Sequence, residues 1–374
     1  MPFDIDQTPT ATLTEIRQQP KAWRELVEVL AGARTQLDMF LREALVDPRT
    51  RILMTGAGTS AFIGEIAAES LRRRTGRRVD AVATTDIVAT PHAVLAERLP
   101  VLLVSFARSG NSPESVAATE LVEELSPSVR HLVITCDSDG LIASEHRNRA
   151  TSFVLDMPPR TNDTGFAMTS SFSTMLLAVQ LAFVDSATGA VEDLAATATS
   201  LLEDQQRLED LIPSDTHRIV YLGSGPLEGL ARESALKALE LTAGRVAAFH
   251  DTPLGFRHGP KAILDPNTAV VLYRSADPYT ARYDDDLLRE LRAARVGAVV
   301  QIGAATGGGR DVTLPGLEAL DDGLRSVAMV VVAQLIGYTS SLRHGCTPDN
   351  PFPNGSVNRV VQGVTIHPLD AQEL

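Results

Sequence analysis

Two short segments in different halves of the chain share one pattern: an Arg-Ile pair, three further residues and a Gly-x-Gly turn. They are RILMTGAG at 51–58 and RIVYLGSG at 218–225. Each is a short apolar run bounded by glycine, as buried parallel strands are. An internal repeat of this kind predicts two copies of one structural unit.

The segments that follow the two turns are related in the same order. Apolar runs at 101–106 and 130–140 in the first half correspond to runs at 268–273 and 295–305 in the second. Helical patterns, with apolar residues at three- and four-residue spacing, lie between them. Strand and helix in alternation, twice over, predict an α/β protein with two tandem doubly wound parallel sheets of flavodoxin-like topology.

The segments outside the repeats have a different character. We expect a short and a longer helix before the first repeat, a polar amphipathic helix between the repeats, and an irregular tail rich in Pro, Gly and Asn. The tail has too many apolar residues for a disordered end, so it is expected to wrap the body and line a site. The predicted divisions are a helical arm (1–47), a first domain (48–190), a linker helix (191–213), a second domain (214–345) and the tail (346–374).

Composition argues against several classes of partner. The 374-residue chain is 44% hydrophobic and 22% charged, which is typical of a well-packed globular protein. Its net charge of −13 argues against nucleic acid, and the basic cluster LRRRTGRR (71–78) is interpreted as a helix end and a turn. Two cysteines, no signal-peptide pattern and no membrane-span pattern favour a cytoplasmic protein without membrane contact.

The first Gly-x-Gly turn does not fit a nucleotide-binding fingerprint. Gly64 comes too late to be the third glycine of a dinucleotide site, and no Gly-Lys-Ser/Thr follows. We therefore expect no nucleotide cofactor. What remains is a helix start that bears Ser60, where free N–H groups suit an anion, although N-capping is the commoner use of such a hydroxyl.

The loop SFARSGNSPES (105–115) carries more hydroxyls than one helix cap needs. Gly110 allows close backbone approach, and Pro113 suits the first position of a helix. Several hydroxyls beside helix N–H groups suit a phosphate monoester, and Arg108 adds a charge-assisted contact. Simple turn chemistry is the alternative. The expected phosphate-binding residues of this loop are Arg108, Ser109, Asn111 and Ser112.

The corresponding loop of the second half, 273–286, has lost the serine cluster and gained acidic residues, which makes it a poor anion site. The second half instead offers acid–base groups. Glu233, Lys237 and Glu240 lie about one helical turn apart, and an exposed i,i+4 salt bridge is the alternative explanation for the first two. His258 precedes Gly-Pro in a turn.

Metal binding is not expected, because the histidines form no HxH or HxxxH pair and the two cysteines stand apart. The hydroxyl-rich loop and the acid–base groups both follow predicted strands. Since ligands of open α/β sheets bind beyond the carboxyl ends of strands, the two sets are expected to meet in one cleft between the domains.

Together these motifs resemble the sugar isomerase (SIS) double-domain family. The tandem Gly-x-Gly turns, ARSGNSPES, ALKALE and RHGP carry the resemblance, which covers about residues 12 to 369. The chain is most similar to the galactosamine-6-phosphate deaminase/isomerases, also described as tagatose-6-phosphate ketose/aldose isomerases. The isomerase half of glucosamine-6-phosphate synthase shares the organisation.

The resemblance implies catalytic roles for three residues. Glu240 matches the carboxylate that moves a proton between C1 and C2, His258 matches the histidine that assists ring opening, and Lys237 matches a lysine on the helix of the base. In relatives, the histidine can come from the neighbouring subunit. The expected partner is therefore a second copy of the chain, in a homodimer or larger homo-oligomer.

The resemblance also implies binding roles. Ser60, Ser109 and Ser112 match phosphate- and sugar-binding positions, and Thr169 and Ser170 fall in a sugar-contacting turn. Gln362 stands where the synthase has a tail lysine, so a step that needs that ammonium must use another group, for which Arg359 is the candidate.

The implied activity is conversion of D-galactosamine 6-phosphate to D-tagatose 6-phosphate and ammonia, by ring opening and proton transfer from C2 to C1. The lack of a glutaminase domain is consistent with the deaminating direction. Two alternatives stay open: a tagatose-6-phosphate aldose/ketose isomerase that releases no ammonia, and a non-catalytic protein that senses a sugar phosphate. The gluco epimer also stays open as substrate.

Overall fold

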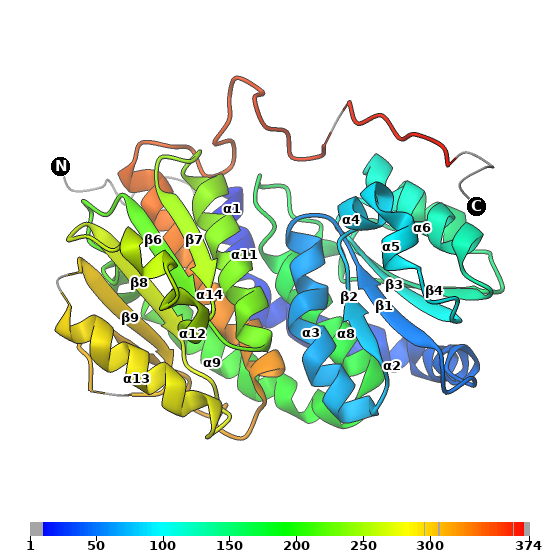
Figure 1. The fold of residues 1–374 in the computed structure, drawn as a ribbon, viewed down its shortest axis with the longest axis horizontal. Coiled ribbons are helices and arrows are strands. Elements are labelled where there is room, and N and C mark those ends of the chain that lie inside the picture. Colours follow the sequence, from blue (N-terminus) through cyan, green and yellow to red (C-terminus); the bar gives the residue numbers. More distant parts are fainter. Residues whose placement is uncertain (1–9, 295, 306, 362, 370–374) are drawn as a thin grey trace.

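A computed structural model describes residues 10–294, 296–305, 307–361 and 363–369. Two five-stranded parallel sheets lie side by side, one in each half of the molecule (Figure 1). The first has the order β2-β1-β3-β4-β5, and the second has the order β10-β9-β8-β6-β7. Renumbered within its own half, each sheet has the order 2-1-3-4-5, which is flavodoxin-like. The predicted fold is confirmed.

The strands are short and mostly buried. In the first sheet they are β1 (Arg51–Thr55), β2 (Val79–Ala81), β3 (Val101–Ala107), β4 (Val129–Thr135) and β5 (Ser152–Asp156). In the second sheet they are β6 (Arg218–Leu222), β7 (Ala247–Asp251), β8 (Thr268–Tyr273), β9 (Ala298–Gly303) and β10 (Asp311–Thr313).

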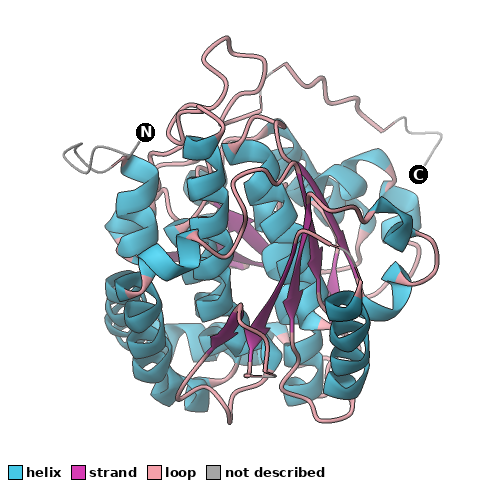
Figure 2. Cartoon of the chain, turned by 90° about the vertical axis from the view of Figure 1, so that its left-hand side faces the viewer, coloured by secondary structure: helices cyan, strands magenta, loops and turns pink. Residues whose placement is uncertain are grey.

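Helices cover the sheets, and Figure 2 shows the strands enclosed between them. Those of the first half are α3 (Thr59–Thr75), α4 (Thr84–Ala89), α5 (Pro91–Val94), α6 (Pro113–Leu125), α7 (Leu141–His146), the 3₁₀ helix η1 (Pro159–Thr161) and α8 (Ser170–Phe183). Those of the second half are α11 (Pro226–Leu241), α12 (Pro253–Phe256), η3 (Pro260–Ile263), α13 (Thr280–Ala293) and α14 (Asp322–Arg343).

The arm and the connector also pack on the body. The arm consists of α1 (Ala11–Arg17) and α2 (Gln19–Ala44), and the connector consists of η2 (Asp185–Ala190), α9 (Val191–Glu203) and α10 (Gln205–Glu209). The connector helix α9 packs on α2 and on α14, so it is part of the shared core. The division of the chain into the five predicted segments stays a prediction.

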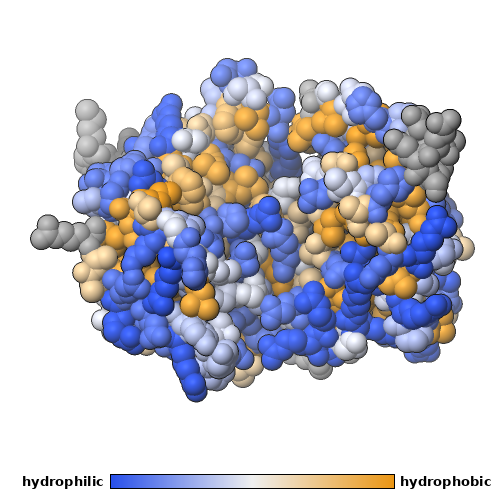
Figure 3. Space-filling view, viewed as in Figure 1, coloured by the Kyte–Doolittle hydropathy of each residue, from blue (hydrophilic) through white to orange (hydrophobic). Residues whose placement is uncertain are grey.

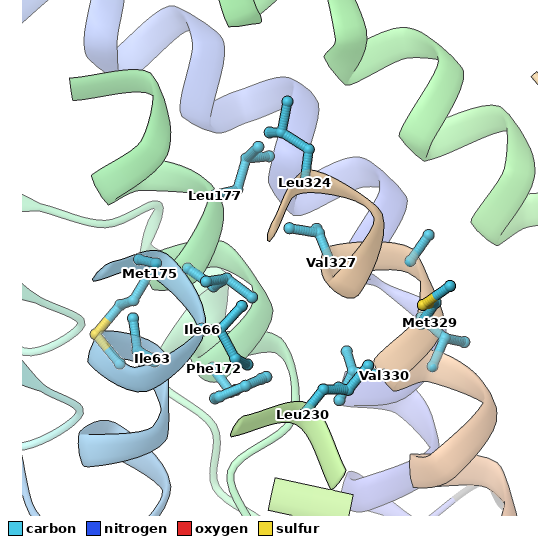
Figure 4. Close-up of a cluster of buried hydrophobic side chains, with 14 of the residues drawn as sticks. Ile63, Ile66, Phe172, Met175, Leu177, Leu230, Leu324, Val327, Met329 and Val330 are labelled. Carbon is cyan, nitrogen blue, oxygen red and sulfur yellow. The ribbon is translucent and has the colours of Figure 1, made fainter. Parts of the chain in front are cut away.

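The two Gly-x-Gly turns place equivalent helices face to face. Gly58 (φ +53°) and Gly225 (φ +57°) adopt the same left-handed conformation directly before α3 and α11, which glycine tolerates best. A Cβ on Gly229 of α11 would lie 2.9 Å from Ile66 Cγ1 of α3, so the two helices touch. Figure 4 shows the apolar core that α3, α8, α11 and α14 form between the sheets.

Among the described residues, α14 alone is long and apolar enough to cross a membrane, and its apolar window is entirely buried in the protein. It therefore belongs to the core. The basic cluster at 71–78 lies where α3 ends, with Gly76 in the left-handed conformation as its C-cap, as predicted. The face in Figure 3 mixes hydrophilic and hydrophobic side chains, and it is hollowed at its upper edge between the two halves.

Candidate active site

A cavity of about 280 Å³ lies beyond the carboxyl ends of β1 and β3, where the strand order of the first sheet reverses. Five groups of residues line it: the turn after β1, the loop after β3, the loop at 166–168, α11 and the tail. Of the predicted site residues, it brings together Ser60, Arg108, Ser109, Ser112 and Glu240.

The turn after β1 is held tightly. A Cβ on Gly56 would lie 2.6 Å from Ser60, so the helix start can approach the strand only because that position is glycine. Ser60 is buried, and its hydroxyl faces the Met168 sulfur at 3.9 Å. The Thr59 hydroxyl accepts a hydrogen bond from Lys237 at 2.9 Å. Ser60 is therefore placed at the cavity wall by the first turn of α3.

The loop after β3 is a left-handed turn into α6. Gly110 has φ +67°, and a Cβ there would lie 2.7 Å from Ile142 Cγ2. Ser112 precedes α6, with Pro113 at its first position as predicted, and its Oγ lies 2.6 Å from Ser115 Oγ. Asn111 is different: its Oδ1 accepts from the Leu141 amide at 2.9 Å and caps α7, so Asn111 does not line the cavity.

Arg108 is buried and joins three segments of the wall. Its guanidinium donates to the carbonyl of Phe166 at 3.3 Å and to the carbonyl of Arg359, in the tail, at 2.9 Å. Burial and then the charge of Arg359 lower its pKa from 12.5 to about 10, so it stays charged at neutral pH. Two like charges at the cavity wall destabilise each other, and a bound anion would relieve that repulsion.

Three contacts hold the tail over the cavity. Asp349 accepts from the amides of Ala11 and Thr12 at 2.8 Å each, at the start of α1. Phe352 packs on Phe166 with ring centroids 5.2 Å apart, and Arg108 forms the third contact. Residues 357–361 then line the cavity, and Figure 1 shows the tail crossing from the second half towards the first. The predicted residue Gln362 lies outside the described residues.

The acid–base groups of α11 form a buried chain. Lys237 is fully buried, with its Nζ 2.5 Å from Glu240 Oε2 and 3.5 Å from Glu233 Oε1. The exposed salt bridge considered for Glu233 and Lys237 is wrong, because neither side chain has any exposed surface. Glu240 has a quarter of its side-chain surface exposed (25%) and faces the cavity.

Burial shifts the pKa values of the buried groups on α11. It raises the pKa of Glu233 from 4.5 to about 8, even though the charge of Lys237 acts to lower it. Burial lowers the pKa of Lys237, but the carboxyl groups of Glu233 and Glu240 outweigh that effect and raise it overall. Glu233 therefore lies behind Lys237, and Lys237 is paired with Glu240 at the cavity.

Thr169 and Ser170 do not line the cavity. They begin α8 and are held by the buried carboxylate of Asp163, which accepts from the Thr169 amide at 2.8 Å and from the Ser170 hydroxyl at 2.5 Å. Their observed role is to fix the loop that carries Phe166 and Met168 to the cavity.

His258 is exposed on the turn after α12 and does not line the cavity of its own chain. Its backbone amide donates to the Gly255 carbonyl at 2.8 Å, which closes the turn. The predicted meeting of His258 with Glu240 therefore does not occur within one chain.

The second half has an internal carboxylate where the first half has its anion loop. After β8, the Ser275 hydroxyl and the Ala276 amide donate to Asp322 at 2.5 and 2.8 Å. Arg325 pairs with the same carboxylate at 3.3 Å. The Ser275 hydroxyl and the Ala276 amide are thus used within the protein.

Sequence reasoning missed most of the apolar wall. Thr59 was visible as a hydroxyl at a helix start but was not singled out. Glu233 was named only as one of several acid–base groups, without a role of its own in the site. The apolar residues of the cavity wall could not be recognised in the sequence, because they look like ordinary core residues. They are Phe106, Phe166, Met168, Leu236, Val357, Val360 and Val361.

Known proteins share this organisation. The SIS domain family model matches residues 44–185. An AgaS protein of Streptomyces coelicolor is 51% identical over 98% of this chain and 97% of its own. The D-galactosamine-6-phosphate deaminase AgaS of Escherichia coli is 45% identical over 97% of each chain. This chain belongs to the AgaS family of SIS-domain proteins.

The likeness to the AgaS family extends to the structure. The tagatose-6-phosphate ketose/aldose isomerase of Escherichia coli superposes with a TM-score of 0.89, at 42% identity, over 96% of this chain and 98% of that one. The match covers almost the whole chain, so both halves share this fold.

Proposed function

We propose that this chain is a D-galactosamine-6-phosphate deaminase/isomerase that forms D-tagatose 6-phosphate and ammonia. The observation that carries the proposal is that the Glu240 carboxylate and the hydroxyl-rich loop after β3 face one cavity of about 280 Å³. A cavity of this size accommodates a single hexose phosphate rather than a dinucleotide. The names of the AgaS relatives support the choice of substrate.

The phosphate is bound at the end of the cavity that the first half forms. Ser109 and Ser112 offer hydroxyl donors, and Ser60 offers another from the start of α3. The first N–H groups of α3 and α6 have no partner inside their helices and carry the positive end of the helix dipole. Arg108 adds its positive charge, so the phosphate dianion is bound without the lysine that a P-loop supplies.

Glu240 is the base of the reaction. It removes the proton from C2 of the open-chain amino sugar and returns it to C1 through an enolamine, in which O1 has gained a proton. The nitrogen loses one proton as C1 is protonated, so the C1 aldehyde and C2 amine become a C1 alcohol and a C2 imine. Water then adds to the imine, and the products are the ketone and ammonia. Lys237, 2.5 Å from Glu240 Oε2, fixes the direction of the carboxylate towards the cavity.

We also propose that His258 acts in the cavity of a neighbouring copy, where it assists ring opening, so that the enzyme is a homo-oligomer. Two observations support this. His258 is exposed and outside the cavity of its own chain. Large apolar side chains are exposed nearby in sequence, on α11, β7 and α12: Leu239, Phe249 and Leu254.

Subunit mixing tests the shared site. Glu240→Gln and His258→Asn homomers are each expected to be inactive. After the two are unfolded and refolded together, a dimer with shared sites recovers about a quarter of the wild-type activity, because half of the dimers then contain one intact site out of two. Recovery that is no greater than in either homomer treated alone contradicts the proposal.

Product analysis tests the activity itself. Purified protein is incubated with galactosamine 6-phosphate and, separately, with glucosamine 6-phosphate and tagatose 6-phosphate, and ammonia and ketose are measured. Ammonia in equal amount to ketose, formed faster from the galacto epimer, is expected. Isomerisation of tagatose 6-phosphate without ammonia release from either amino sugar would favour the simple isomerase. No turnover of any of the three substrates would favour a sugar-phosphate sensor.

A cytoplasmic location is proposed together with this metabolic role.

A further inference from the structure

Three potential metal ligands meet at the end of the first sheet that is opposite the cavity. They are Glu123 near the end of α6, His131 in β4 and His146, the last residue of α7. One ligand atom from each lies within 4.8 Å of the other two. His131 pairs in register with Ser152, the first residue of β5, so the group lies at the amino ends of the strands.

The two imidazoles are buried, but their ring nitrogens are poorly satisfied. His146 Nδ1 lies 2.9 Å from Ser152 Oγ, which leaves His146 Nε2 buried and without a hydrogen-bond partner among the described residues. His131 Nε2 lies 2.8 Å from Glu123 Oε1, but not in hydrogen-bond direction, and its Nδ1 is also unpartnered. Burying such groups without partners costs free energy, and a bound cation would offset that cost.

The two histidines are arranged so that both can act as ligands. Their rings lie 4.3 Å apart, and a neutral imidazole keeps one nitrogen lone pair that can bind a cation. If the Ser152 contact is a hydrogen bond from His146 Nδ1–H, the lone pair is on the unpartnered Nε2. A second contact of this kind orients ligating histidines in known metal sites.

We propose that Glu123, His131 and His146 bind one divalent transition-metal ion, with Zn²⁺ as the best fit. Two imidazole nitrogens and one carboxylate oxygen are a common donor set for Zn²⁺, and they leave a fourth position for water. The Glu123 side chain is 40% exposed, which gives the ion a route from solvent.

Binding requires two small adjustments. Ligand atoms of a tetrahedral zinc site lie about 3.3 Å apart, so the atoms of the present group, which lie within 4.8 Å of one another, must approach by up to about 1.5 Å. Arg149, whose Nη1 lies 2.9 Å from Glu123 Oε1, must also release that oxygen. The ion would join α6, β4 and α7 into one unit. Since it lies at the opposite end of the strands from Glu240, its role is structural and it takes no part in the proton transfer.

Zinc titration of the purified, EDTA-treated full-length chain tests this inference. With a chromophoric chelator as competitor, one tight Zn²⁺ per chain is expected, together with a higher melting temperature. His146→Gln and Glu123→Gln are each expected to weaken binding by about 100-fold or more. The control is His217→Gln, which removes an exposed histidine 3.3 Å from Asp265 and should change nothing.

Cobalt absorption adds a direct readout, because Co²⁺ bound by two imidazoles and a carboxylate in a tetrahedral site gives strong visible bands that depend on both histidines. If His146→Gln does not fold, Glu123→Gln decides, because its side chain is partly exposed. The proposal is overturned if the wild type takes up no Zn²⁺, or if both cluster variants bind it as tightly as the wild type.

Discussion

Lys237 of the second half donates a 2.9 Å hydrogen bond to the hydroxyl of Thr59 in the first half. Thr59 begins α3, whose first turn also bears Ser60 at the cavity wall. The same ammonium is paired with Glu240. One buried side chain therefore joins the proposed base to the helix start that borders the proposed phosphate site.

Replacing Lys237 with Met should lower kcat far more than it raises KM. Without the ammonium, Glu240 loses its only ion pair within 4 Å among the described residues and is free to turn away from the substrate. We expect kcat to fall by about 100-fold or more, as for the loss of a group that positions a general base. Steady-state kinetics measures both constants. Lys261→Met, which breaks a surface pair with Glu290, is the control and should leave kcat unchanged.

Replacing Glu233 with Gln should change how stability depends on pH. Glu233 has a folded pKa of about 8 against an ordinary 4.5, so between these values the folded chain keeps a proton that the unfolded chain has lost. Stability then falls by about 1.4 kcal/mol per pH unit from this residue as the pH rises, and glutamine removes that slope. Urea unfolding at pH 5.5 and 7.5 measures it. If the free energy of unfolding changes by the same amount between pH 5.5 and 7.5 in the wild type and in Glu233→Gln, Glu233 is ionised in the folded state.

Replacing Ser112 with Ala should weaken binding of the phosphate group. One lost hydrogen bond to a charged group costs about 1.5–3 kcal/mol, so KM or the inhibition constant of inorganic phosphate should rise by roughly 10- to 100-fold. Ser128→Ala, an exposed serine after the end of α6, is the matched control. Equal phosphate affinity in Ser112→Ala and wild type would remove this serine from the phosphate site.

Replacing Arg108 with Lys should loosen the tail as well as the phosphate site. Lysine cannot donate to two carbonyls with the same planar geometry, so the Phe166 and Arg359 contacts cannot both persist. We expect a higher KM and faster proteolytic cleavage between residues 352 and 361. Arg147→Lys, at a surface pair with Asp156, controls for the change of side chain. A raised KM with unchanged cleavage would separate substrate binding from tail anchoring.

The repeat was sufficient to predict the fold, because Gly58 and Gly225 mark the same left-handed turn in both halves and the apolar runs between turns and helices can only be buried strands. The hydroxyl-rich loop at 105–115 also stands out in the sequence, and Ser109 and Ser112 of this loop line the cavity, but their binding of phosphate stays a prediction. Asn111 shows where such predictions stop. Its side-chain amide could bind a ligand or cap the next helix, and the sequence does not show that the Leu141 amide lies close enough to donate to it.

Contacts between distant segments could not be predicted. Lys237 and Thr59 lie on different helices of different halves, and the sequence gives no measure of how those helices pack. Thr169 and Ser170 resemble a sugar-contacting turn, but they serve Asp163 because that carboxylate is buried beside them. The role of His258 in the site of another copy, which the resemblance implies, stays a proposal.

The most direct test of the account is proton exchange at C2 of galactosamine 6-phosphate in deuterated water, followed by NMR in the Glu240→Gln variant. The account predicts that the variant still binds inorganic phosphate with wild-type affinity, incorporates no deuterium and releases no ammonia. Glu228→Gln, at an exposed position of the same helix, should bind phosphate, incorporate deuterium and release ammonia as the wild type does. Deuterium incorporation at the wild-type rate in Glu240→Gln would contradict the central claim that this carboxylate moves the proton.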